Sequence, residues 1–140
     1  MQKKILVIDD EGKIRHLYDK LFKAVGNQLF EIIEAANAED ATEILIRGGI
    51  DLVLLDINMP GIDGQVMNEV IKEYNPQAKV IVSSVYPVVK QRVIIPEAFD
   101  YFDKSQGLLQ LLSKVSRAFV NEAGIKNNDE YEDIMILNPA

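Results

Sequence analysis

The sequence predicts a single parallel α/β domain, a doubly wound sheet of five strands with helices on both faces. Short runs of aliphatic and β-branched residues, typical of strands buried on both sides, recur five times along the 140 residues. Stretches with apolar residues at helical spacing lie between them. Strands that alternate with helices form a parallel sheet covered on both faces, which is the fold class that we expect.

The first half of the chain contains three predicted strands, at residues 5–8, 30–35 and 52–55. An apolar stripe from Ile14 to Val25 predicts the helix between the first two strands. Asn37 is placed to cap the next helix, and Asp40, at its third position, is placed to accept from the free amides.

The second half begins with a loop at residues 58–64 and a helix that Asn75-Pro76 terminates. Residues 80–82 and 99–102 are the last two predicted strands, and Ser105 is expected to cap a final helix. Pro87 and Pro96 interrupt the segment between these strands, so the fourth helix is predicted to be truncated or partly unwound.

Composition restricts the classes of function. Apolar residues make up 48% of the chain, enough for the core of one domain. The net charge of −7 argues against binding of nucleic acid by this region, because phosphate contacts need clustered Lys and Arg. The absence of cysteine excludes thiolate chemistry. No apolar run approaches the ~18 residues of a membrane span, so we expect a cytoplasmic protein without membrane partners.

Chemically active side chains follow four of the predicted strands. In sheets of this class, ligands bind beyond the carboxyl ends of the strands. The residues at those ends are Asp9, Asp10, Asp56, Ser83, Ser84 and Lys104. Three converging carboxylates need a cation, and oxygen ligands favour Mg²⁺. A hydroxyl and an ammonium group would stabilise a phosphoryl group, and one carboxylate can be its acceptor.

Each of these features alone has an ordinary structural explanation. An Asp-Asp pair after a strand is often a solvated turn or a helix cap, and a single lysine there usually has no chemical role. Their joint placement at successive strand ends is what favours a phosphoryl site.

Two segments carry a family resemblance. The run from Ile5 to Glu11, Ile-Leu-Val-Ile-Asp-Asp-Glu, and the run from Leu54 to Gly64, Leu-Leu-Asp-Ile-Asn-Met-Pro-Gly-Ile-Asp-Gly, resemble the receiver domain of bacterial two-component response regulators. The resemblance covers roughly residues 3–122 and is of the chemotaxis-regulator type. It implies a flavodoxin-like sheet with the strand order 2-1-3-4-5.

The resemblance also implies a role for each site residue. Asp56 would be the phosphoacceptor. Mg²⁺, or Mn²⁺ in its place, would bind Asp10, Asp56 and the backbone carbonyl of Asn58 directly, and Asp9 through water. Lys104 would pair with the phosphoryl group. Ser84 and Tyr101 would form the switch. The donor would be a sensor histidine kinase or a histidine phosphotransfer protein, and the output a protein partner at the face formed by the fourth helix, fifth strand and fifth helix.

Two residues depart from the family pattern. Val85 stands where Ala or Gly is usual, so its methyl groups are expected to gate access to Asp56. Ser105 stands where a cis proline is usual. A cis peptide before a non-proline residue costs about 2.5–4 kcal/mol, so we expect a trans Lys104–Ser105 bond, a shifted loop and a less well placed lysine.

Three functional hypotheses remain open. The first is a phosphorylation-activated switch that only phosphorylates and dephosphorylates itself, without turnover of a small molecule. The second is a pseudo-receiver that binds partners without phosphorylation. The third is an aspartyl-phosphate phosphatase, against which the order Asp9-Asp10-Glu11 argues, because those enzymes need Asp-x-Asp after the first strand. Residues 1–122 would form the receiver domain, and residues 123–140 an acidic tail or the stub of a removed output domain.

Overall fold

The computed structural model describes residues 2–26 and 28–123. Strands and helices alternate along this part of the chain. Their bounds are β1 Lys3–Ile8, α1 Gly12–Val25, β2 Phe30–Ala35, α2 Ala38–Arg47, β3 Leu52–Leu55, α3 Gly64–Tyr74, β4 Lys79–Ser84, α4 Val88–Ile94, β5 Asp100–Asp103 and α5 Leu108–Ala123. The predicted α/β class is confirmed.

The five strands form one parallel sheet in the order β2-β1-β3-β4-β5. This is the order that the family resemblance implied. β1 lies beside β3, with Ile8 opposite Leu55, so the residues that follow these two strands leave the sheet side by side. Farther along the same edge, Ser84 of β4 is opposite Asp103 of β5. The topology therefore brings the four predicted strand ends to one edge of the sheet.

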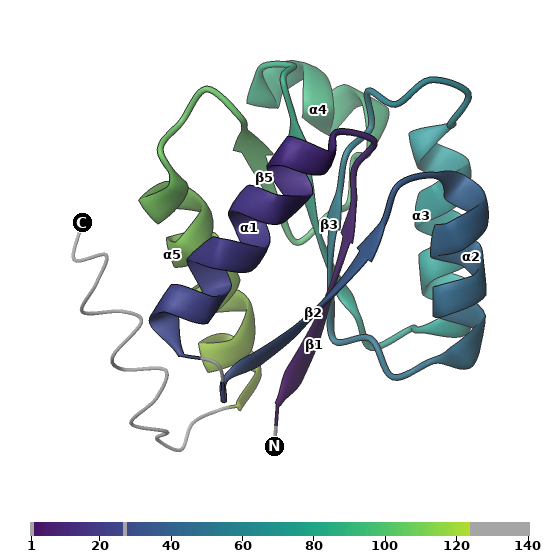
Figure 1. Cartoon of the computed structure of the whole chain (residues 1–140). Helices are drawn as coiled ribbons and strands as arrows, with labels where there is room; N and C mark the ends of the chain where they lie inside the picture. The colour runs from purple at the N-terminus through teal and green to yellow at the C-terminus, as the bar shows by residue number, and fades with distance from the viewer. Residues whose placement is uncertain (1, 27, 124–140) are drawn as a thin grey trace.

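Helices cover both faces of the sheet, as Figure 1 shows, with α1 and α5 on one side and α2 and α3 on the other. Side chains of β1, β3 and β4 alternate between the two faces, because successive residues of a strand point to opposite sides. Ile5, Val7 and Leu54 pack in the core under α1 and α5, whereas Leu6 and Val53 pack in the core under α2 and α3. The central strands are thus buried on both faces.

Local capping agrees with the sequence prediction at α2. The Asn37 side chain accepts a hydrogen bond from the Asp40 amide at 2.8 Å. At α3 the Asp63 carboxylate accepts from the amides of Gln65 and Val66, at 2.9 and 3.3 Å, which fixes the helix that follows the Asp56 loop. Such caps satisfy amides that have no partner within the helix.

The structure confirms a short α4 of seven residues, between the two prolines that interrupt the helical pattern. The Lys104–Ser105 peptide is trans, as expected, and among the described residues no peptide bond is cis. The prediction that Ser105 caps the last helix is wrong. That helix begins at Leu108, and the Ser105 hydroxyl donates instead to the Asp103 carboxylate.

Within the described ranges, no helix combines the length and the apolar character that crossing a membrane requires. The predicted boundary after residue 122 falls inside the last turn of α5, which extends to Ala123. The rest of the predicted tail, residues 124–140, lies outside the described residues.

Candidate functional site

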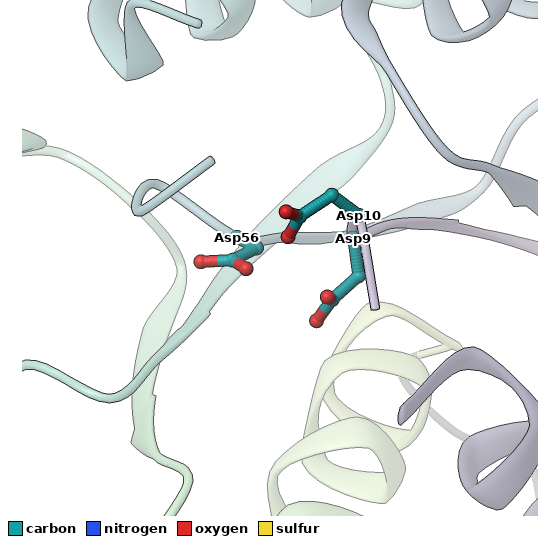
Figure 2. Close-up of side chains that lie close together, drawn as sticks. All are labelled: Asp9, Asp10 and Asp56. Carbon is teal, nitrogen blue, oxygen red and sulfur yellow. The ribbon is translucent and has the colours of Figure 1, made fainter. Parts of the chain in front are cut away.

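Three carboxylates meet at the carboxyl ends of β1 and β3. One oxygen atom from each of Asp9, Asp10 and Asp56 lies within 4.8 Å of the others, and Figure 2 shows the three side chains together. Asp9 and Asp56 are buried, whereas Asp10 is exposed. The Asp56 amide donates to the Ile8 carbonyl at 2.9 Å, so the pairing of the two strands continues to Asp56 and fixes its position.

Lys104 supplies the positive charge of the site. Its ammonium nitrogen lies 2.7 Å from Asp9 Oδ2, 3.2 Å from Asp56 Oδ2 and 3.8 Å from Glu11 Oε1. Burial alone would lower the pKa of Lys104, but the hydrogen bond to Asp9 and the charge of Asp56 outweigh burial and raise it. The lysine is therefore charged, and despite the trans peptide it reaches Asp56 directly.

Asp56 is held by contacts to both of its carboxylate oxygens. The Asn58 amide donates to Oδ1 at 2.8 Å, and Lys104 donates to Oδ2 at 3.2 Å. Burial raises the pKa of Asp56, although the Asn58 amide and the Lys104 charge oppose this effect. The carboxylate is oriented by donors at both oxygens while one side of it faces a cavity.

That cavity has a volume of about 250 Å³. Three acidic side chains, a lysine and three other loop residues surround it. Its lining residues are Asp10, Glu11, Asp56, Asn58, Pro60, Val85 and Lys104. Oxygen ligands of this kind fit a hard divalent cation, because Mg²⁺ binds through one or two carboxylates and keeps other positions for phosphate oxygen.

The family model for the response regulator receiver domain matches residues 5–116. The chain belongs to this family. Among curated proteins, the receiver domain is 37% identical over 86 residues to sporulation initiation phosphotransferase F of Bacillus subtilis, covering 61% of this chain and 67% of that protein. It is 34% identical to the probable transcriptional regulator ycf27 of Porphyridium aerugineum, with 91% of this chain covered but only 54% of that relative.

Solved structures give the same result. The response regulator protein TrrA of Thermotoga maritima, solved in complex with Mg²⁺-BeF, is 35% identical, with 83% of this chain and 98% of that chain covered and a TM-score of 0.72. TrrA has also been solved in complex with the histidine kinase ThkA, with the same identity and TM-score. The Mg²⁺-BeF complex and the kinase complex are properties of TrrA.

The two serines at the end of β4 in this receiver domain face opposite ways. The buried Ser84 hydroxyl accepts a hydrogen bond from the Tyr86 amide at 3.2 Å. Ser83 lies on the other face of the sheet, where its hydroxyl shares a hydrogen bond of 2.9 Å with Tyr18. The structure brings together the carboxylates and Lys104, whereas the Ser84 hydroxyl is bonded to the Tyr86 amide and Ser84 is not among the residues that line the cavity.

The other predicted switch residue, Tyr101, is buried between β5 and α4. Its hydroxyl donates to the Ile95 carbonyl and accepts from the Ala98 amide at 3.2 Å, and Arg92 lies over its ring at 4.5 Å. Tyr101 therefore points inward in this structure. The predicted gate, Val85, lines the cavity with 57% of its surface exposed.

Sequence reasoning missed two tyrosines, one beside the cavity and one on the opposite face of the sheet. The Tyr86 hydroxyl donates to Asn58 Oδ1 at 3.0 Å, which connects the loop after β4 to the loop after β3. Tyr86 lies just beyond a strand end, so the rule that located the other residues could have found it. Tyr18 lies on the apolar stripe of α1, a position that by itself indicates only core packing, and the structure is needed to show that its hydroxyl meets Ser83.

Proposed function

We propose that this receiver domain is a phosphorylation-activated switch in which Asp56 accepts the phosphoryl group. The observation that carries the proposal is the environment of its carboxylate. Asp56 is buried, its two oxygens are oriented by Asn58 and Lys104, and it lines a cavity large enough for a phosphoryl group. A nucleophile held in this way needs little reorganisation before it attacks.

In the transfer, an oxygen of the Asp56 carboxylate forms a bond to phosphorus. The donor's bond to phosphorus breaks, and its electron pair leaves on the imidazole of a phosphohistidine or on the acetate of acetyl phosphate. Lys104 stabilises charge on the phosphoryl oxygens. Asp9, Asp10 and Asp56, with the Asn58 carbonyl, would hold Mg²⁺. A cation held there would supply positive charge to the phosphoryl oxygens.

The response would start at Ser84. When its hydroxyl turns from the Tyr86 amide to a phosphoryl oxygen, the loop after β4 would lose the hydrogen bond between Ser84 and Tyr86. Tyr101, buried between β5 and α4, would follow this rearrangement and shift the population of two states of the neighbouring surface.

We infer that the output surface is the face formed by α4, β5 and α5. Val89 and Val93 of α4 are four residues apart and 77% and 74% exposed, and Leu109 of α5 is 53% exposed. Residues at that spacing lie on one side of a helix, and exposed apolar side chains are typical of protein contacts. The downstream partner is therefore proposed to be a protein.

The phosphodonor is proposed to be a sensor histidine kinase or a histidine phosphotransfer protein. The support is the TrrA relative, which forms a complex with a histidine kinase, and the exposure of the Asp56 cavity at the edge of the sheet. Small phosphodonors reach the same cavity.

A second candidate function is a phosphorylation-independent interaction module, and Val85 favours it. Val85 lines the cavity at a position where the family usually has Ala or Gly. If its side chain blocked access to Asp56, the domain would bind partners without being phosphorylated.

One experiment separates the two candidates. Incubation of the full chain with acetyl phosphate and Mg²⁺, followed by intact mass measurement, should show one added phosphoryl group. Asp56→Asn, or omission of the metal, should abolish it, while Asp63→Asn should not, because Asp63 caps α3 outside the cavity. No added mass on the unmodified chain would favour the interaction module, and undiminished labelling of the Asp56 variant would place the site elsewhere.

A further inference from the structure

The loop that carries Lys104 is a tight turn beside the site. β5 ends at Asp103, and the Gln106 amide donates to the Asp103 carbonyl at 2.8 Å. Lys104 and Ser105 are thus the two central residues of a hydrogen-bonded β-turn. The Lys104 amide also donates to the Ser84 carbonyl at 2.8 Å, which joins the start of this turn to the end of β4.

The Asp103 carboxylate accepts two further hydrogen bonds within the same turn. Oδ1 accepts from the Ser105 amide at 2.8 Å and from the Ser105 hydroxyl at 2.7 Å. These two donors lower the pKa of Asp103, so the group remains an anion that accepts both bonds. Bonds from an Asp side chain to the amide two residues later are a common way to fix a turn.

Lys104 depends on a fixed backbone more than an exposed lysine would. Its side chain is only 8% exposed, and its ammonium nitrogen is in contact with Asp9 and Asp56. A four-carbon side chain has many rotamers. A buried ammonium group is stabilised only in those rotamers that bring it into contact with the carboxylates. The direction in which the side chain leaves the turn decides whether it reaches them.

We propose that Asp103 is the positioning residue for Lys104, acting through its two hydrogen bonds to Ser105. The turn, with its trans peptide, aims the lysine at Asp56, and Asp103 holds the turn in shape without touching the reacting atoms. This inference rests on the proposed phosphorylation of Asp56 only for its kinetic consequence, because the placement of Lys104 can be measured without any phosphodonor.

The first measurement is the NMR signal of the Lys104 side-chain Cε in the isotopically labelled full chain, without phosphodonor or metal. Asp103→Ala should move this signal toward that of the exposed Lys13. Asp103→Asn keeps an oxygen acceptor and should return the signal most of the way, and Ser105→Ala, which loses one of the two donors, should shift it less than Asp103→Ala. The matched control is Asn37→Ala, which removes a similar cap from α2 and should leave the Lys104 signal unchanged.

The second measurement is the rate of phosphorylation by acetyl phosphate with Mg²⁺ in a double-mutant cycle. Asp103→Ala should slow the reaction roughly tenfold, less than the ~100-fold loss that a misplacement of about 1 Å can cause. In the Lys104→Met background the same substitution should have no further effect, since Asp103 acts only through the lysine. A purely structural role would lower the rate equally in both backgrounds.

The outcomes are distinct. A displaced Lys104 signal, its recovery in Asp103→Asn and a non-additive cycle support the proposal. An unmoved signal in Asp103→Ala, an Asp103→Asn variant as impaired as the alanine variant, or equal slowing in both backgrounds would overturn it. If the chain accepts no phosphoryl group at all, the proposed function fails, and the NMR comparison alone still decides the role of Asp103.

Discussion

The ammonium nitrogen of Lys104 lies closer to Asp9 than to Asp56, at 2.7 Å against 3.2 Å. Asp9 is also a proposed metal ligand, so without a cation the lysine neutralises the carboxylates that the cation would bind. The lysine and a bound cation would thus compete for the same carboxylates, and the negative charge of the proposed phosphoryl group would attract both.

We expect Lys104→Met to raise the Mg²⁺ affinity roughly tenfold, because two charges about 4 Å apart near a protein surface interact by about 4 kcal/mol before screening. The same substitution should slow phosphorylation. Calorimetric titration with Mg²⁺ at low ionic strength measures the affinity. The control is Lys114→Met, because Lys114 pairs with Asp100, away from the cavity. An affinity that stays unchanged or falls would contradict the competition.

Val85→Ala should speed phosphorylation, dephosphorylation or both several-fold, because the valine side chain lines the cavity beside Asp56. The rates are measured with acetyl phosphate, and after its removal. Val89→Ala is the matched control, an exposed valine on α4 that does not line the cavity. If the unmodified chain and Val85→Ala have equal rates of phosphorylation and of dephosphorylation, Val85 does not gate access to Asp56.

Tyr101→Ala should leave phosphorylation of Asp56 nearly intact and weaken the response of the α4, β5 and α5 face, because Tyr101 is buried between β5 and α4 without lining the cavity. Amide exchange of residues 86–122, with and without the phosphoryl group, measures the response. Tyr101→Phe keeps the ring and loses the contacts to Ile95 and Ala98, which separates packing from hydrogen bonding. Equal responses in all three chains would exclude Tyr101 as the coupler.

Asp56→Asn should stabilise the metal-free chain at neutral pH. Burial raises the pKa of Asp56 above its unfolded value, so the folded state binds the proton more tightly and the ionised group costs stability. This cost is complete above the folded pKa and disappears as pH falls below the unfolded pKa of about 3.9. The gain in melting temperature from Asp56→Asn should therefore shrink as pH is lowered through that window. A gain that grows toward acid pH would show the opposite sign of the shift.

Tyr18→Phe should destabilise the fold by about 1–3 kcal/mol, the usual cost of leaving a buried hydroxyl without its partner. The partner is Ser83, whose hydroxyl lies 2.9 Å from that of Tyr18. Adding Ser83→Ala to the Tyr18 variant should recover part of the loss, since both polar groups are then gone. Urea unfolding of the single and double variants measures the coupling, and strictly additive losses would show that the bond contributes nothing.

Much of the site follows from position along the chain. Each of four site residues follows a strand: Asp9, Asp10, Asp56 and Lys104. Because the carboxyl ends of parallel strands lie at one edge of the sheet, the strand pattern of the sequence was enough to predict that these side chains cluster. Ser105 misled the sequence analysis, because a serine before a helix looks like a cap. The preference of its hydroxyl for the Asp103 carboxylate depends on how the turn closes in space.

By itself the sequence determined the α/β alternation, the short α4 between its prolines, and the residues at the strand ends, because these depend on local periodicity and on which residues break it. Tertiary structure alone decided that the Ser84 hydroxyl bonds to the Tyr86 amide, that Tyr18 meets Ser83, and that Lys104 lies nearest Asp9. Those contacts join segments far apart in the chain or depend on how a loop packs. They are set by competition among burial, charge and hydrogen bonding, which acts only once the strands and helices have packed together.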